Sequence, residues 1–140
     1  MTTRVEVAMS TRLTVPADKC WEKIGKWGTI HEWHPAVATT ELEGEGVGSI
    51  RILTLGDGAV LKERLESQTD NSYEYSFVEH PLPVDDYHGK ISVEDNGDGT
   101  TTLSWGSNFV ANGVSDDEAR QLISGIFQAG FDALHGEFTA

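Results

Sequence analysis

The chain has 140 residues, of which 38 % are hydrophobic and 24 % charged, as is usual for a globular protein with a buried core. Its net charge of −13 and its ten scattered basic residues exclude a nucleic-acid-binding protein, which needs clustered Lys and Arg. The single cysteine excludes an internal disulfide, and no apolar run is long enough to insert into a membrane. Because the N-terminal residues also lack the apolar core of a signal peptide, we expect one domain, residues 1–140, in the cytoplasm.

The N-terminal segment predicts a strand followed by two short helices. Apolar and polar residues alternate over residues 5–15, which is typical of a half-buried strand, and Pro16 ends it. Residues 17–27 then read as a helix, and residues 29–33 as a second short helix or turn that stops before Pro35. The side chains expected to point inward from the first helix are Cys20 or Trp21, Ile24 and Trp27.

Short strands with direct turns follow. They are predicted over residues 37–42, 49–55, 59–67, 72–78, 86–94 and 100–110, with a proline-containing loop over residues 80–85. Parallel strands would need crossover helices between them, and the turns are too short for that. The sequence therefore predicts an α+β protein with one seven-stranded antiparallel sheet.

The last quarter of the chain predicts one long helix from Ser115 to about Phe138. Ser115-Asp116-Asp117-Glu118 has the pattern of a capping box, in which the Ser115 hydroxyl accepts a hydrogen bond from the amide three residues later. A helix of this length, roughly 36 Å, needs a broad apolar partner, and a curved sheet beneath it can leave a cavity. The face expected to point inward comprises Leu122, Ile123, Ile126, Phe127, Gly130, Phe131, Leu134 and Phe138.

Arg51 and Glu63 are the charged pair that the strand pattern places on an inward face. If Gly56-Asp57-Gly58 forms a three-residue turn, Arg51 lies opposite Glu63 and shares a face with Leu53. An unpaired charge there would be costly, so we expect an ion pair whose head groups face the helix. Two interpretations remain open: a pair that only ties two strands together, and a polar anchor in a binding cavity.

Aromatic side chains are numerous on the predicted inward faces. Such a set is either simply core or the wall of a small-molecule pocket, which is usually apolar with a few polar groups. The pocket interpretation predicts a cavity of a few hundred Å³ or more. The set comprises Trp27, Trp33, Tyr75, Phe77, Trp105, Phe109, Phe127 and Phe131.

Metal and cofactor motifs are not found. The five histidines include His31 and His34, but no Cys or acidic residue completes a zinc-site spacing, so we expect no metal. The Gly-rich run 44–48 lacks a following helix, which excludes a phosphate-binding loop, and no cofactor is expected. His34 is either a general acid or base at the mouth of a cavity or an ordinary loop histidine.

The order of elements and several short motifs resemble the SRPBCC superfamily, the START-like helix-grip fold, in its polyketide cyclase/dehydrase branch. The resemblance covers essentially the whole chain. The motifs are Val15-Pro16-Ala17 with Trp21 and Trp27, Trp33-His34-Pro35, Gly48 to Arg51, Glu63-Arg64-Leu65, Tyr73-Glu74-Tyr75, and Trp105 with Phe109 before the last helix.

The resemblance implies a seven-stranded antiparallel sheet that grips the C-terminal helix around an elongated apolar cavity. It implies a carrier or binder of a small hydrophobic, lipid, aromatic or polyketide-like molecule. The first alternative is a cyclase or dehydratase in which Arg51 orients an enolate or carboxylate and Tyr75, Glu63 or His34 moves protons. A second alternative is a protein-interaction module, with a collapsed cavity and an exposed apolar patch. Neither the ligand nor the oligomeric state follows from the sequence.

The ligand-binding residues expected from the inward faces and the resemblance together are Trp27, Trp33, Arg51, Leu53, Glu63, Tyr75, Phe77, Trp105, Phe109, Ile123, Phe127 and Phe131. Access to the cavity is expected beneath residues 29–35 or 80–85, whose prolines prevent ladder pairing. Bending of the long helix at Gly125, Gly130 or Gly136 is the competing route.

Overall fold

A seven-stranded antiparallel sheet forms the framework of the protein, as predicted. The computed structural model describes residues 4–138. The strands are β1 (Val5–Leu13), β2 (Val37–Glu43), β3 (Ile50–Leu55), β4 (Val60–Gln68), β5 (Ser72–Glu79), β6 (Val84–Asp95) and β7 (Thr101–Ala111). Their order across the sheet is β1-β7-β6-β5-β4-β3-β2, so β1 and β2 form the two edges. Because β6 begins at Val84, the loop expected over residues 80–85 is shorter than predicted.

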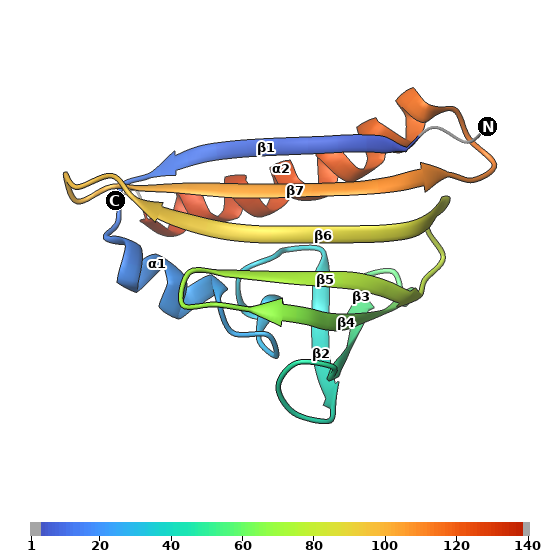
Figure 1. Ribbon diagram of the computed structural model, residues 1–140, viewed down its shortest axis with the longest axis horizontal. Helices are drawn as coiled ribbons and strands as arrows, with labels where there is room; N and C mark the ends of the chain where they lie inside the picture. Colours follow the sequence, from blue (N-terminus) through green and yellow to red (C-terminus); the bar gives the residue numbers. More distant parts are fainter. Residues whose placement is uncertain (1–3, 139–140) are drawn as a thin grey trace.

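Helix α2 (Asp116–Phe138) runs along the inner face of the sheet and packs against β1 and β7 (Figure 1). Its capping residue is Ser115, whose Oγ accepts a hydrogen bond of 3.1 Å from the Glu118 amide. The buried residues of the helix follow one face: Ala119, Ile123, Phe127, Gly130, Phe131 and Leu134. Leu122 was expected on that face, but it is 37 % exposed because it flanks the stripe that begins at Ala119. No helix within residues 4–138 is both long and apolar enough to cross a bilayer.

The first helix, α1 (Ala17–Ile24), is shorter than the predicted residues 17–27. It ends at Gly25, where a Cβ atom would lie 2.6 Å from Cδ2 of the Trp21 ring. Trp27 therefore reaches the core from the loop after the helix, where it is 6 % exposed. A 3-10 turn, η1 (Ile30–Glu32), forms where a second short helix or turn was predicted. Cys20 is the inward-facing residue of the Cys20/Trp21 alternative.

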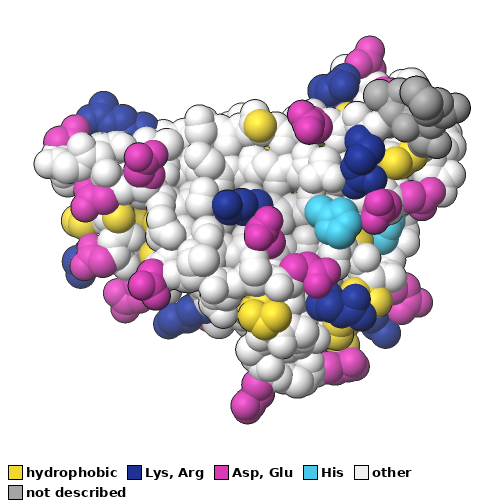
Figure 2. Space-filling model, in the orientation of Figure 1, with side chains coloured by type: hydrophobic (Ala, Val, Ile, Leu, Met, Phe, Trp, Pro, Cys, Tyr) yellow, Lys and Arg dark blue, Asp and Glu magenta, His cyan; other side chains and the backbone are white. Residues whose placement is uncertain are grey.

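The outer face of the sheet, seen in Figure 2, carries mostly small and polar side chains with scattered charges.

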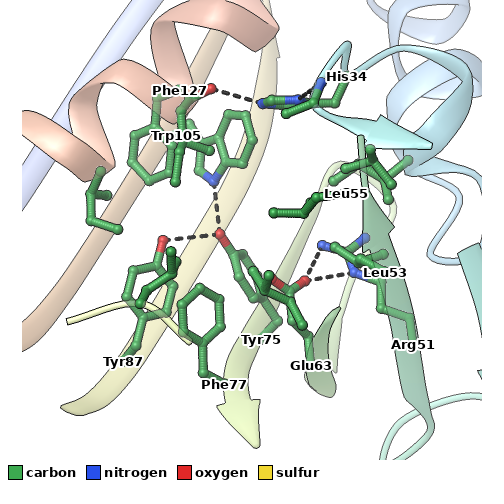
Figure 3. A pocket seen from close by; sticks show the side chains of 17 residues that line it. His34, Arg51, Leu53, Leu55, Glu63, Tyr75, Phe77, Tyr87, Trp105 and Phe127 are labelled. Carbon is green, nitrogen blue, oxygen red and sulfur yellow. Dashed lines mark hydrogen bonds and ion pairs between the residues drawn. The ribbon is translucent and has the colours of Figure 1, made fainter. Parts of the chain in front are cut away.

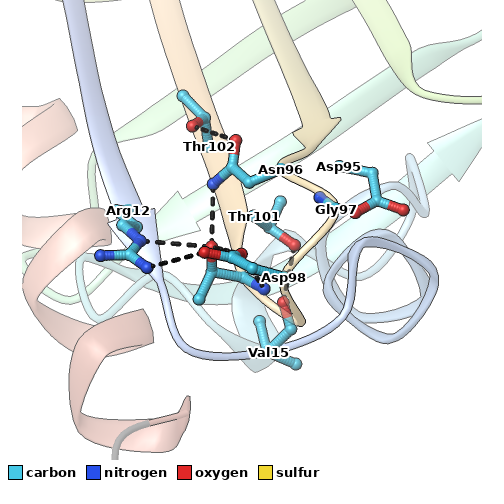
Figure 4. A network of polar contacts seen from close by, with 9 residues as sticks. Arg12, Val15, Asp95, Asn96, Gly97, Asp98, Thr101 and Thr102 are labelled. Atoms are coloured by element: carbon cyan, nitrogen blue, oxygen red, sulfur yellow. Dashed lines mark hydrogen bonds and ion pairs between the residues drawn. The ribbon is translucent and has the colours of Figure 1, made fainter.

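The β6–β7 turn is bonded to β1 and to the segment that follows β1 (Figure 4). Arg12 forms an ion pair of 3.0 Å with Asp98, and the Thr101 hydroxyl donates to the Val15 carbonyl at 2.7 Å. At the other edge of the sheet, Glu41 and Glu43 of β2 are exposed.

Gly130 sets how closely α2 approaches the sheet and the η1 segment. A Cβ atom at this position would lie 3.0 Å from ring atoms of both His34 and Trp105, and 3.1 Å from the Trp33 ring. These rings are buried and contact one another, so none of them can move away freely. The glycine is therefore a packing requirement of the helix-to-sheet contact.

We expect Gly130→Ala to destabilise the fold by about 1–3 kcal/mol, because the added methyl group overpacks this cluster. Gly125→Ala is the matched control in the same helix, since its Cβ would meet nothing within 4 Å. There alanine should stabilise the protein by about 0.5–1 kcal/mol through helix propensity. Urea unfolding of both variants measures the difference, and effects of the same sign would contradict the packing argument.

Candidate functional site

A pocket lies between α2 and the strands β2 to β7, in the place predicted for a cavity (Figure 3). Its volume is about 70 Å³, enough for more than one water molecule but well below the few hundred Å³ expected. The reason is that aromatic rings fill the space. Trp105 stacks on Phe127 with ring centroids 4.3 Å apart, and Phe77 stacks on Tyr87 at 3.9 Å. The lining residues are Ile30, His34, Ala36, Val37, Arg51, Leu53, Leu55, Leu61, Glu63, Tyr75, Phe77, Leu82, Tyr87, Trp105, Ile123, Ile126 and Phe127.

Arg51 and Glu63 form the predicted ion pair on the wall of this pocket. They are direct cross-strand partners on β3 and β4, because the turn between the strands sets the predicted register. Nε and Nη2 of Arg51 both lie 2.7 Å from Oε1 of Glu63, and the two side chains are 1 % and 6 % exposed. Nη1 donates to the Trp27 carbonyl at 3.2 Å and to the Tyr73 hydroxyl at 3.4 Å. Protein groups therefore accept hydrogen bonds from three of the five guanidinium N–H donors, and Nη2 contacts Glu63 as an ion pair.

The electrostatic surroundings keep this pair charged. Burial alone would lower the pKa of Arg51, but the Glu63 carboxylate and Tyr73 raise it above its ordinary value. The guanidinium carbon also lies 3.9 Å from the centroid of the Trp27 ring, a cation–π contact. Burial raises the pKa of Glu63, and Arg51 opposes that rise. Two contacts of 2.7 Å from a permanently charged partner hold Glu63 as a carboxylate at neutral pH.

A second polar group in the pocket consists of Tyr75, Tyr87 and Trp105. Indole Nε1 of Trp105 donates to the Tyr75 hydroxyl at 3.0 Å, and the two tyrosine hydroxyls lie 3.2 Å apart. Burial raises the pKa of Tyr75 and of Tyr87, so both phenols stay protonated. One hydrogen bond between two hydroxyls uses one of their two protons. The second proton is available to another acceptor, and the buried Ser107 hydroxyl beside Tyr87 is one such group.

His34 is fixed in one neutral tautomer by the backbone on either side of it. Its Nε2 lies 2.8 Å from the Ile126 carbonyl and must donate, and its Nδ1 accepts from the Ala36 amide at 3.1 Å. Burial lowers the pKa of His34 below its ordinary value of 6.5. The structure thus leaves neither ring nitrogen free for the general acid or base role considered from the sequence. The ring instead fastens the η1 segment to α2.

Acid is expected to weaken the fold through His34. Because its folded pKa is lowered, the unfolded state takes up a proton first as the pH falls below 6.5, so stability is lost in that direction. Guanidinium unfolding at pH 7.5 and 5.5 should show a smaller pH dependence in His34→Gln than in the unmodified protein. His80→Gln is the comparison variant, because burial also lowers the pKa of His80. Equal pH dependence in His34→Gln and the unmodified protein would contradict the assignment.

Eight of the predicted ligand-binding residues line the pocket: Arg51, Leu53, Glu63, Tyr75, Phe77, Trp105, Ile123 and Phe127. Four others are buried but lie behind its wall. Trp27 covers Arg51, and Trp33 packs on Trp105 with ring centroids 5.6 Å apart. Phe109 stacks on Tyr87 at 5.7 Å, and Phe131 lies 6.4 Å from Trp105. They support the lining residues, because each packs against a group that faces the pocket.

Tyr87 is the polar lining residue that the sequence interpretation missed. The strand pattern could have predicted it, because Tyr87 lies at even spacing from Ile91 and Val93 and so shares their inward face of β6. Leu55 and Leu82 were not predicted as ligand-binding residues, although the strand pattern places Leu55 on the same inward face as Leu53. Both are half-buried and border the pocket from the end of β3 and the loop before β6. Within residues 4–138 no group of three His, Cys, Asp or Glu side chains is placed to hold a metal ion. Burial raises the pKa of Cys20 to about 11, which makes the thiol unreactive.

Comparisons with known proteins agree with this geometry. A family model described as "Polyketide cyclase / dehydrase and lipid transport" matches residues 4–139. The structure of the Bacillus cereus protein XoxI is 30 % identical, with a TM-score of 0.91 over 96 % of this chain and 95 % of that one. An uncharacterised Bacillus thuringiensis protein is also 30 % identical, with a TM-score of 0.91 over 96 % and 99 % of the two chains.

A more distant structure shares the fold alone. The Zhui aromatase/cyclase from Streptomyces sp. R1128 is 20 % identical, with a TM-score of 0.78 over 96 % of this chain and 93 % of that one. A search of curated protein sequences found no match.

Proposed function

The chain belongs to the polyketide cyclase/dehydrase and lipid transport family, and from that membership we propose that it binds a small, largely apolar molecule in the pocket beneath α2. The observation that carries this proposal is the make-up of the pocket wall. Leucine, isoleucine and aromatic side chains surround a few fixed polar groups, Arg51, Glu63 and the Tyr75–Tyr87 pair. This combination is typical of ligand pockets, in which apolar surface provides affinity and a few polar atoms orient the ligand.

Binding requires the pocket to widen. A cavity of roughly 150 Å³ accommodates benzene in another protein, and the pocket here measures about 70 Å³. The half-buried lining side chains are Leu55, Phe77, Leu82 and Ile126. Of these, Leu82 lies in a loop, so its displacement opens more space at less cost than separating strands. Opening on the side of His34 would instead break its hydrogen bond to the Ile126 carbonyl of α2. We therefore propose the loop of residues 80–83 as the entrance.

The test is binding of toluene to the isotope-labelled protein, followed by NMR, together with native mass spectrometry for a co-purified molecule. We expect chemical-shift changes at pocket-lining residues. Ala36→Phe should abolish them, because Ala36 lines the pocket from an exposed position where a large ring blocks the space. Val47→Phe is the matched control at a remote position that is 62 % exposed. Equal toluene binding by both variants, or no toluene binding by the unmodified protein, would contradict the proposal.

A catalytic role in the same pocket is the second candidate, favoured by one observation. Glu63 can accept a proton and the tyrosine pair can donate one, and both line the same small space. A cyclase or dehydratase reaction needs such a pair of groups. Arg51 fits the role of orienting an enolate poorly, because Glu63 neutralises its charge and Glu63, Trp27 and Tyr73 accept from three of its five N–H donors. If a bound molecule is identified, a mass change on incubation that is lost in Glu63→Gln would support catalysis.

A further inference from the structure

We infer from the surroundings of Glu63 that the pocket selects neutral ligands that carry a hydroxyl group on an otherwise apolar body. This inference rests on the proposed function and specifies the chemistry of the ligand. In the proposed complex, the ligand hydroxyl donates a hydrogen bond to Oε2 of Glu63.

The first argument is the uneven use of the two carboxylate oxygens. Both contacts from Arg51 end on Oε1, as Figure 3 shows. Among the described residues, no side chain or backbone amide donates to Oε2, although the Glu63 side chain is only 6 % exposed. The fully buried side-chain atoms that lack a partner do not include Oε2, so this oxygen reaches accessible space, where only water can donate to it in the free protein. A ligand that excluded this water without supplying a donor would bind at a cost. Since Glu63 lines the pocket, a donor on a bound molecule is the group that satisfies it.

The second argument concerns charge. The only lysine or arginine among the lining residues is Arg51, and Glu63 already neutralises it. His34 is neutral, because burial lowers its pKa and its Nδ1 accepts a hydrogen bond. A carboxylate or phosphate on the ligand would therefore meet Oε2 of Glu63 with no free cation to offset the repulsion. The pocket disfavours anions.

The third argument separates a hydroxyl from a group that only donates. Tyr75 and Tyr87 remain protonated and share one hydrogen bond, which leaves one of their protons for another acceptor, either the buried Ser107 hydroxyl beside Tyr87 or an oxygen of the ligand. A hydroxyl oxygen can accept that hydrogen bond while its own proton goes to Glu63. A ketone, an ether or a halide provides the acceptor but leaves Oε2 unsatisfied.

The test compares three probes, each a benzene ring with one substituent: phenol, fluorobenzene and benzoate. Fluorobenzene has nearly the size of phenol but no donor, and benzoate carries the negative charge. Isothermal titration calorimetry at pH 7.5 should show phenol binding about tenfold more tightly than fluorobenzene, the value of one hydrogen bond to a charged group. Benzoate should not bind measurably.

The variants isolate Glu63. In Glu63→Gln the side-chain oxygen can still accept from Arg51 while the amide NH₂ takes the place of Oε2, so the preference for phenol should disappear. Glu79→Gln makes the same change on β5, where the side chain is 73 % exposed, and should keep the preference. If Glu63→Gln does not fold, the ratio of the three probes on the unmodified protein decides the question. Equal binding of phenol and fluorobenzene, or binding of benzoate, would overturn the inference and leave the proposed function standing. Failure of all the probes and of toluene would overturn both.

Discussion

Loss of Arg51 alone is expected to destabilise the protein by about 3–5 kcal/mol, because it leaves the Glu63 carboxylate buried without its partner. In Arg51→Met the side chain keeps much of its length but no charge. The double variant Arg51→Met with Glu63→Leu should recover most of the loss, since it removes both charges and leaves apolar groups of similar size. Guanidinium unfolding of the single and double variants measures both effects.

The control for this prediction is an exposed ion pair on the neighbouring strands. Lys62 and Glu79 lie 3.3 Å apart, with side chains 37 % and 73 % exposed. We expect Lys62→Met to change stability by less than about 1 kcal/mol, because solvent screens the pair. If Arg51→Met and Lys62→Met lower the free energy of unfolding equally, burial of the Arg51–Glu63 pair does not determine the size of the loss. If the double variant is no more stable than Arg51→Met, the unpaired carboxylate is not the cause of the loss.

Gly89→Ala is expected to have the second large effect, about 3 kcal/mol of lost stability from overpacking. Gly89 is the cross-strand partner of Tyr75, and a Cβ atom there would lie 2.5 Å from Oη and 2.6 Å from Cε1 of the Tyr75 ring. The ring can pass this close to β6 because position 89 has no side chain. Displacing it breaks the hydrogen bond from Trp105 and changes the pocket wall.

Fluorescence and near-ultraviolet circular dichroism of Trp105 and its neighbours should report this displacement alongside the stability loss. Gly56→Ala is the control, because its Cβ would meet nothing within 4 Å and its backbone conformation suits alanine. It should leave the spectra unchanged. Native spectra and native stability in Gly89→Ala would contradict this prediction, because they would mean that the Tyr75 ring accommodates the added methyl group.

The pairing of Arg51 with Glu63 could be predicted because it depends on one local quantity, the length of the turn at Gly56-Asp57-Gly58. Once the turn has three residues, the two-residue period of the strands fixes every later pair. The long helix and its cap were likewise local patterns, and both are confirmed. The fold followed from such patterns and from the resemblance.

The size of the pocket could not be predicted in the same way. The two-residue period tells which face a ring is on, but not whether it stacks on a neighbour or stands away from it. Phe77 and Tyr87 stack at 3.9 Å, and Trp27 turns onto Arg51, so the space that the count of aromatic residues suggested is largely filled. Gly89 shows the same limit, because its importance depends on a ring from another strand.

The free edge of the sheet at β2 has a consequence for how copies of the protein meet. An unpaired strand edge is a template for adding a strand from another molecule, and β1, the opposite edge, is packed against α2. Glu41 and Glu43 are exposed on β2, and two copies joined antiparallel along this edge would bring their glutamates together. Like-charge repulsion then opposes edge-to-edge stacking at neutral pH. The acidity of this strand thus disfavours pairing between two β2 edges.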